Sequence, residues 1–139
     1  MKGYTTIHAG SARQALTRLR FICQLSETDL PMSALNSLVS EAIDVVVHLS
    51  RGPHGPHVTE VLAVEDLAGG AESTQFTVTE VFRKDQHDRP LTWTGEIPVR
   101  MDRPLREIGV DLRHLLEADL PAPPAPARAS AARTKRAQT

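Results

Sequence analysis

The sequence predicts a fold of mixed helices and strands, the α/β class, because two apolar patterns follow one another along its 139 residues. Residues 12–43 repeat apolar side chains at the three- and four-residue spacing of amphipathic helices. Residues 45–83 instead hold short apolar or alternating runs, separated by Gly- and Pro-rich turns, as strands do. Hydrophobic residues make up 40% of the chain and aromatic residues only 4%, so we expect an aliphatic core.

The N-terminal segment is predicted to be a strand that runs into a helix. Thr5, Thr6 and Ile7 are β-branched and favour a strand. Gly10 breaks this strand, and Ser11 is a good N-cap for the helix that follows. The helix has one apolar stripe, which consists of Ala12, Ala15, Leu16, Leu19, Ile22 and Cys23.

A second helix and a buried strand are expected next. Pro31 suits the first turn of a helix, where its missing N–H needs no partner. Asn36 and Ser40 belong to the predicted solvent-facing side of this helix. The run 45–49, apolar on both sides apart from His48, indicates a short strand buried on both faces. The apolar side of the helix consists of Met32, Leu35, Leu38, Val39, Ala42 and Ile43.

The rest of the ordered chain is predicted to be antiparallel strands followed by two short helices. Alternating apolar and polar side chains indicate half-buried strands, and Gly109 is placed to end the first short helix. The expected elements are a turn at 52–57, strands at 58–65, 75–83 and 91–94, and helices at 103–108 and 111–117.

The C-terminal tail, residues 120–139, is rich in Pro, Ala and Arg and is predicted to be disordered. Residues 121–139 hold four basic and no acidic side chains, so the remainder carries −5 of a total net charge of −1. The tail lacks aromatic residues for base stacking, so we expect no specific nucleic-acid partner. A solubilising role and a membrane-surface role are equally consistent with it.

The expected location is cytoplasmic, with peripheral contact at the inner face of the cell membrane as the alternative. A single cysteine, Cys23, fits a reducing compartment. The start of the chain lacks the apolar run of a signal peptide, and no stretch approaches the length of a membrane span.

Five short motifs follow one another within residues 3–65. The first consists of Gly3, Thr6-Ile7-His8-Ala9 and Gly10-Ser11. Behind it stand Arg13-Gln14-Ala15-Leu16-Thr17-Arg18-Leu19, Asp29-Leu30-Pro31, Ala42-Ile43-Asp44-Val45-Val46-Val47, and Leu49-Ser50-Arg51 with His57-Val58-Thr59-Glu60-Val61. In this order they resemble the type II/IV secretion ATPase family, whose histidine box the first motif matches, and most of all its CpaF-type branch, which drives Tad/Flp pilus assembly. Gly10 departs from the family, where Asn is usual.

The resemblance implies a partial RecA-like P-loop NTPase core, made of its late strands and helices, with a C-terminal antiparallel β extension and short helices. It implies three regions. Residues 1–50 would be the C-terminal part of the ATPase domain, 51–119 the β-rich extension with two short helices, and 120–139 the tail. The strand at 4–7 would then lie in the centre of a sheet.

The function implied by the resemblance is that of a C-terminal fragment of a hexameric ATPase for type II/IV secretion or Tad/Flp pilus assembly. Its partners would be further copies of itself and inner-membrane platform proteins, and its cofactors in the intact motor ATP and Mg²⁺. The sequence holds no G-x-x-x-x-G-K-[ST] motif and no Walker B acidic strand end, so we expect no cofactor and no ATP hydrolysis of this chain alone. The alternative is a non-catalytic module that docks on a secretion ATPase ring.

His8 is the nucleotide sensor that the resemblance implies, in an intact motor only, with Thr6 close to the nucleotide. An imidazole can donate to a phosphate oxygen, and the start of the next helix is expected to present free N–H groups to an anion. Taken alone, His8 is better explained as a strand histidine bonded to backbone, and only the surrounding motifs favour the sensor role. Arg13, Arg18 and Arg20 are candidates for an anion or subunit contact, against the alternative of a solvated helix face.

No metal site is predicted. His54 and His57 have a metal-like spacing, and His48 could lie nearby. Zinc sites, however, normally assemble four ligands that include cysteine or carboxylate, and Cys23 is remote on an apolar helix stripe. A solvated turn is therefore the preferred interpretation of these histidines.

Overall fold

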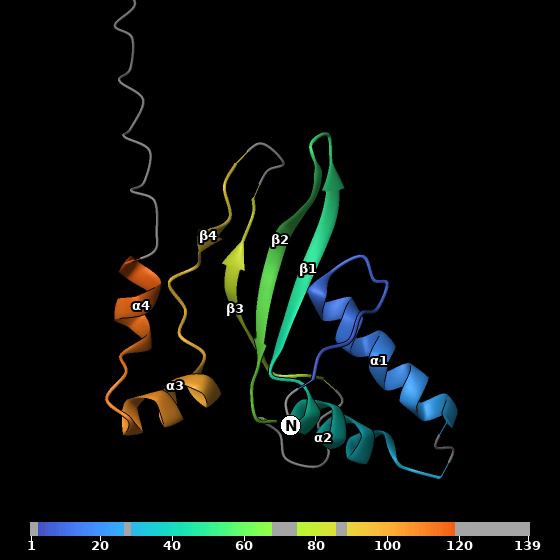
Figure 1. The fold of residues 1–139 in the computed structure, drawn as a ribbon. Helices are drawn as coiled ribbons and strands as arrows, with labels where there is room; N and C mark the ends of the chain where they lie inside the picture. Colours follow the sequence, from blue (N-terminus) through green and yellow to red (C-terminus); the bar gives the residue numbers. More distant parts are fainter. Residues whose placement is uncertain (1–2, 27–28, 68–74, 86–88, 119–139) are drawn as a thin grey trace, which may run out of the picture.

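The computed structural model describes residues 3–26, 29–67, 75–85 and 89–118. Two helices, an antiparallel sheet and two further helices follow one another along this part of the chain, so the fold mixes helices and strands as the α/β prediction states (Figure 1). In chain order the elements are α1 (Ala12–Ser26), α2 (Met32–Ala42), β1 (Val45–Gly52), β2 (Gly55–Val64), β3 (Val78–Arg83), β4 (Thr92–Trp93), α3 (Val99–Glu107) and α4 (Leu112–Ala118). The predicted tail at 120–139 lies outside the described residues.

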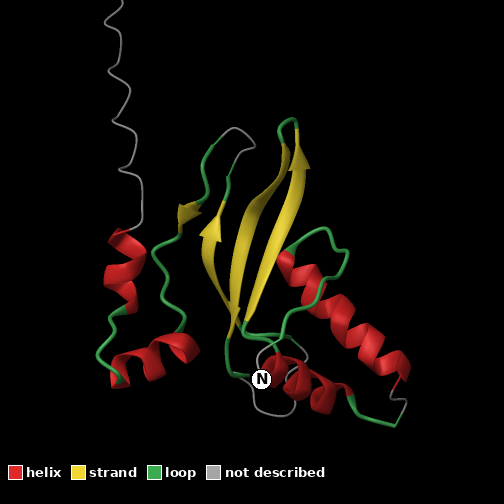
Figure 2. Ribbon diagram, in the orientation of Figure 1, coloured by secondary structure: helices red, strands yellow, loops and turns green. Residues whose placement is uncertain are grey.

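The sheet has the strand order β1-β2-β3-β4, and every neighbouring pair in it is antiparallel (Figure 2). β1 and β2 form a hairpin that closes at the pair Gly52 and Gly55, so strand pairing extends into the predicted turn. Gly55 has a φ of 106°, a conformation that glycine adopts without strain. An antiparallel arrangement of this kind does not confirm the predicted RecA-like core, because such cores are built on parallel strands.

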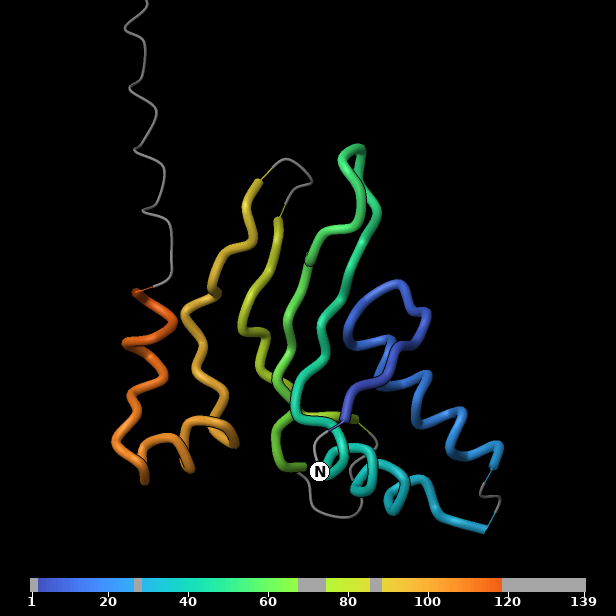
Figure 3. The backbone as a smooth tube through the Cα atoms, viewed as in Figure 1, coloured from blue at the N-terminus to red at the C-terminus, as the bar shows by residue number. Residues whose placement is uncertain are grey.

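The predicted strand at 4–7 is wrong: residues 3–9 form no helix or strand. The segment passes beside β1 before α1 begins (Figure 3), where the Ala9 carbonyl oxygen lies 3.3 Å from Nε2 of His48. Tyr4 is fully exposed. β-branched residues favour a strand only where a neighbouring strand supplies backbone and side-chain partners, and no strand of the described sheet pairs with this segment.

Helices α1 and α2 pack on one face of the sheet and enclose the hydrophobic core. The predicted stripe of α1 is confirmed in its first half, where Ala12, Ala15 and Leu16 are buried. Ile22, further along the stripe, is instead exposed. The buried core consists of Leu16, Val39, Val64 and Phe76, with Leu19, Cys23, Ile43, Val46 and Val78 packed against it.

Two burial predictions, one for α2 and one for β1, are wrong, because both depend on how the helices pack. Asn36 and Ser40 were expected to face solvent but are buried. Arg20 of α1 reaches the Asn36 side chain, and Arg100 of α3 donates to the Ser40 carbonyl oxygen. β1 was expected to be buried on both faces, but Val45, Val47 and Leu49 are exposed. Only the face of β1 that carries the other residues is covered by the helices, so the strand alternates in burial along its length.

Both C-terminal helices are present, and α4 begins at Leu112, next to its predicted start. α3 starts at Val99, earlier than expected, and Gly109 ends it with a φ of 80°. The Val110 N–H donates to the Leu105 carbonyl oxygen at 2.9 Å, which satisfies a helix-end acceptor. α4 lies beside β4, where the Arg113 guanidinium stands 5.8 Å from the ring centre of Trp93. None of the helices within the described ranges has the length and apolar character needed to cross a bilayer.

Candidate functional site

The structure leaves His8 and Thr6 exposed in the irregular segment ahead of α1. Their neighbours Ala9 and Gly10, rather than these two side chains, turn toward α1 and line a pocket there. The role of His8 as a nucleotide sensor, and the place of Thr6 near a nucleotide, stay predictions.

The start of α1 is closed by side chains of the protein itself. Ser11 is the N-cap that the sequence predicted, since its Oγ accepts from the Gln14 N–H at 3.1 Å. The Ala12 N–H donates to Oε2 of Glu60 on β2 at 2.8 Å, and the Gly10 N–H donates to Oε1 of Gln14 at 3.1 Å. The expectation of free N–H groups for an anion is therefore wrong at these three positions. A carboxylate from β2 already occupies the place that a bound anion would take.

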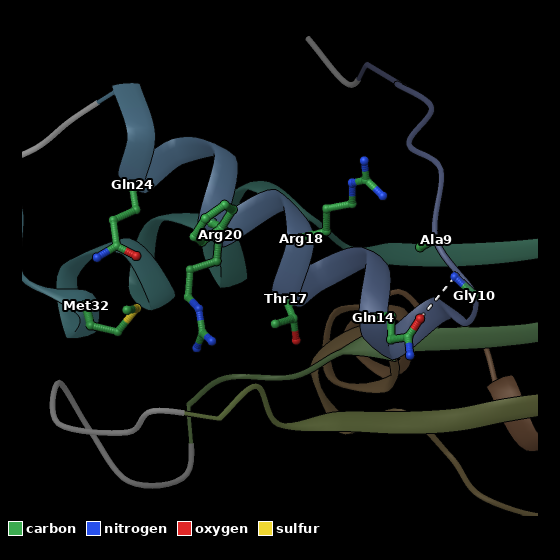
Figure 4. A pocket seen from close by; sticks show the side chains of 9 residues that line it. Ala9, Gly10, Gln14, Thr17, Arg18, Arg20, Gln24 and Met32 are labelled. Carbon is green, nitrogen blue, oxygen red and sulfur yellow. Dashed lines mark hydrogen bonds between the residues drawn. The ribbon is translucent and has the colours of Figure 1, made fainter.

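A pocket of about 460 Å³ runs along the exposed side of α1 (Figure 4). Most of its lining residues come from α1, where Gln14, Thr17, Phe21 and Gln24 recur at intervals of three or four and so lie on one side of the helix. Arg18 and Arg20, two positions apart, point to different sides of it in Figure 4. The lining consists of Ala9, Gly10, Gln14, Thr17, Arg18, Arg20, Phe21, Gln24 and Met32.

The charged groups of this pocket are two arginines, of which one is held by contacts within the protein and the other is exposed to solvent. Arg20 is held in place: its Nη1 donates to Oδ1 of Asn36 at 3.1 Å, and its guanidinium stands 5.6 Å from the ring centre of Phe76. Arg18 is exposed, and no hydrogen bond or ion pair joins it to another residue of the described part of the chain. The pocket is therefore cationic, and Arg18 is its available cation.

The three arginines that the sequence offered for an anion or subunit contact differ in whether they line the pocket. Arg18 lines the pocket, as Arg20 does. Arg13 is exposed on the same helix but does not line it. A function of Arg13 or Arg18 as an anion or subunit contact stays a prediction, and the geometry distinguishes the two residues.

Phe21 is the pocket residue that sequence reasoning missed. Its side chain is 58% exposed, and Met32 from α2 lines the same pocket. Phe21 lies outside the predicted apolar stripe of α1. An aromatic residue off this stripe could have been recognised from the sequence as a candidate for an exposed binding residue. A large aromatic residue off the buried face of a helix must either find another cover or stay exposed.

The histidines considered for metal binding take part in separate contacts. Nδ1 of His48 lies 2.8 Å from Oγ1 of Thr59. Nδ1 of His57 lies 3.4 Å from the Gly55 carbonyl oxygen. Within the residues that the structure describes, no three His, Cys, Asp or Glu side chains form a group that could hold a metal ion.

Comparison with known proteins finds sequence similarity to a curated protein, but no matching family model or solved structure. The chain is 33% identical over 78 residues to a protein of Sinorhizobium fredii (strain NBRC 101917 / NGR234) described as "Probable conjugal transfer protein TrbB". The matched region covers 54% of this chain and 23% of that protein, so the chain spans less than a quarter of its relative's length.

These comparisons correct the family assignment made from the sequence motifs. The predicted membership of the type II/IV secretion ATPase family, in its CpaF-type branch, is wrong, because neither a family model nor a solved structure supports it. The five motifs were each short, and their order alone did not identify a family. The similarity that the comparisons do give is to a conjugal transfer protein.

Proposed function

We propose that the chain is a protein-binding part of a conjugal transfer apparatus, a machinery related to type IV secretion. The similarity to a conjugal transfer protein supports this setting. The observation that carries the proposal is the pocket along α1, in which the available Arg18 lies one helical turn from the exposed Phe21. Arginine and aromatic side chains are enriched in protein interfaces, so this pairing favours a partner protein as the ligand.

The N–H groups at the start of α1 already have acceptors within the protein, which supports a binding site made of side chains. Backbone N–H groups at a helix start bind phosphate well when they are free. Here Glu60 and Gln14 occupy them, so recognition has to use the side chains on the exposed face of the helix.

Exposed apolar side chains extend the surface beyond the pocket. Phe21, Ile22 and Leu25, all on the second half of α1, are exposed together. Single exposed apolar residues are ordinary, but a contiguous group beside a cation is typical of an interaction site. The surface therefore has the composition of an interface core flanked by charge.

The helix that carries this surface is fixed on its buried side. The Glu60 contact holds its start, the Arg20–Asn36 hydrogen bond ties its middle to α2, and Leu16 packs into the core. A surface that is already ordered loses less conformational entropy on binding. ATP and Mg²⁺ have no part in this proposal. A further copy of the chain and an inner-membrane platform protein are candidate partners.

Plasmid transfer tests the proposal. In the source bacterium, deletion of the coding sequence should lower the frequency of conjugal plasmid transfer, and the intact chain supplied in trans should restore it. A chain with Phe21→Ala should restore transfer poorly. Leu115→Ala is the matched control, because Leu115 on α4 is 51% exposed and lies outside the pocket. Undiminished transfer in the deletion strain would overturn the proposal.

A further inference from the structure

We infer that the pocket along α1 binds an acidic segment of the partner protein, with a carboxylate on Arg18 and an apolar side chain against Phe21. The inference rests on the proposed function, since it names the chemistry of the partner at the same site. It commits to a peptide, and other anionic ligands are outcomes of the test.

Charge complementarity is the first argument. The nine residues that line the pocket include two arginines and no aspartate or glutamate. Arg20 is committed to Asn36, whereas Arg18 is exposed and has no partner among the residues that the structure describes. A guanidinium presents its N–H groups as a fork that matches a carboxylate, and such bonds are among the strong ones in proteins.

The shape of the lining is the second argument. Gln14, Arg18 and Phe21 stand three or four positions apart on α1, and Gln24 continues this spacing. Gln14 and Gln24 point to the same side of the helix in Figure 4, and Arg18 borders the pocket from the other side. From Gln14 to Gln24 the helix rises about 15 Å. An extended peptide advances ~3.3 Å per residue, so about five residues would match this length.

The polar groups that line the pocket beside Arg18 and Phe21 suit a peptide backbone. Oε1 of Gln14 accepts from the Gly10 N–H, which leaves the side-chain NH₂ of Gln14 as a donor. Thr17 and Gln24 add hydroxyl and amide groups to the same lining. Phe21 and Met32 form the apolar end, where one leucine or phenylalanine of the ligand would be covered.

A phosphate-rich ligand fits the same site less well. Strong binding of nucleic acid needs several phosphates neutralised by several cations, and the pocket offers one available arginine. The N–H groups at the start of α1, the other feature that binds phosphate, are held by Glu60 and Gln14. One carboxylate and one apolar anchor therefore match what the pocket presents.

Fluorescence anisotropy with the full chain tests the inference. The probes are labelled synthetic peptides of the inferred length that hold glutamates around one leucine or phenylalanine, and the same peptides with glutamine or lysine in place of glutamate. We expect the glutamate peptides to bind about tenfold more tightly than the glutamine peptides, and Arg18→Gln to remove about that factor. Arg13→Gln is the matched control and should change binding less than about twofold, since Arg13 lies outside the pocket.

Four outcomes would overturn the inference: equal binding of glutamate and glutamine peptides, unchanged binding after Arg18→Gln, an equal loss after Arg13→Gln, or tighter binding of a single-stranded oligonucleotide or an anionic lipid vesicle. Circular dichroism of Arg18→Gln checks that this exposed substitution leaves the fold intact. The transfer assay is independent of the peptide assay. A transfer defect without peptide binding would contradict this inference alone, whereas peptide binding without a transfer defect would contradict the proposed function alone.

Discussion

Glu65, directly after β2, receives the backbone N–H of Arg100 on its carboxylate at 2.8 Å, a contact that joins positions 35 residues apart. The Val99 N–H and the Thr79 hydroxyl donate to the same carboxylate at 3.0 and 2.7 Å. The side chain of Arg100 in turn donates to the Ser40 carbonyl oxygen and to Asp44. Glu65 and Arg100 thus fix the start of α3 to the sheet and to the end of α2.

Replacing Glu65 with alanine should destabilise the fold. The side chain is 8% exposed, so its loss leaves two helix-start N–H groups and a hydroxyl without their acceptor. We expect the free energy of unfolding in urea to fall by about 2–3 kcal/mol. Glu96→Ala, at an exposed glutamate, serves as the control. An equal change in both variants would contradict the anchoring role.

Glu60→Ala should weaken the start of α1. Its carboxylate accepts the Ala12 N–H, and a lost acceptor at a helix start lowers stability by about 1 kcal/mol. Ser11→Ala removes the predicted N-cap and should lower stability by a similar amount, about 1 kcal/mol. Urea denaturation of both single variants measures these values. No loss in Glu60→Ala would show that the contact does not support the helix.

Arg20 and Asn36 should be energetically coupled. The hydrogen bond between their side chains is the link of α1 to a buried polar side chain of α2. In a double-mutant cycle with Arg20→Met and Asn36→Leu, we expect an interaction energy of about 1–2 kcal/mol. Additive effects in thermal or urea unfolding would mean that the two side chains act independently.

Phe21→Ala should leave stability within about 0.5 kcal/mol of the unaltered chain, because the side chain is exposed. Leu16→Ala, on the same helix and 1% exposed, should lower it by about 2–5 kcal/mol. The difference between the two losses of stability distinguishes Phe21, as a binding residue, from Leu16, as a core residue. A large loss of stability in Phe21→Ala would place Phe21 in the core and remove it from the candidate interface.

The sequence predicted what local patterns determine. The Ser11 cap, the first half of the α1 stripe, the β1–β2 turn and the end of α3 at Gly109 depend on residues close to one another in the chain. Each is a case in which spacing and residue type fix the backbone.

The features that sequence reasoning missed depend on contacts between distant residues. Glu60 lies 48 positions from Ala12, whose N–H it accepts at the start of α1, and no local sequence pattern predicts this hydrogen bond. Asn36 is buried because Arg20 reaches it from another helix, so a polar residue was assigned to the wrong side of α2. The strand propensity of Thr5 and Thr6 was real but found no neighbouring strand, and the exposed Phe21 became part of a site only once α1 was placed on the sheet.

The central claim is that Arg18 in the α1 pocket makes the contact on which plasmid transfer depends. The most direct measurement is the transfer frequency in the deletion strain complemented with Arg18→Gln or with Arg13→Gln. The two variants lose the same charge from the exposed side of the same helix, but only Arg18 lines the pocket. We predict that Arg18→Gln lowers transfer about tenfold, in proportion to one lost charge-assisted contact, while Arg13→Gln restores it fully. Equal transfer with the two variants would contradict the claim.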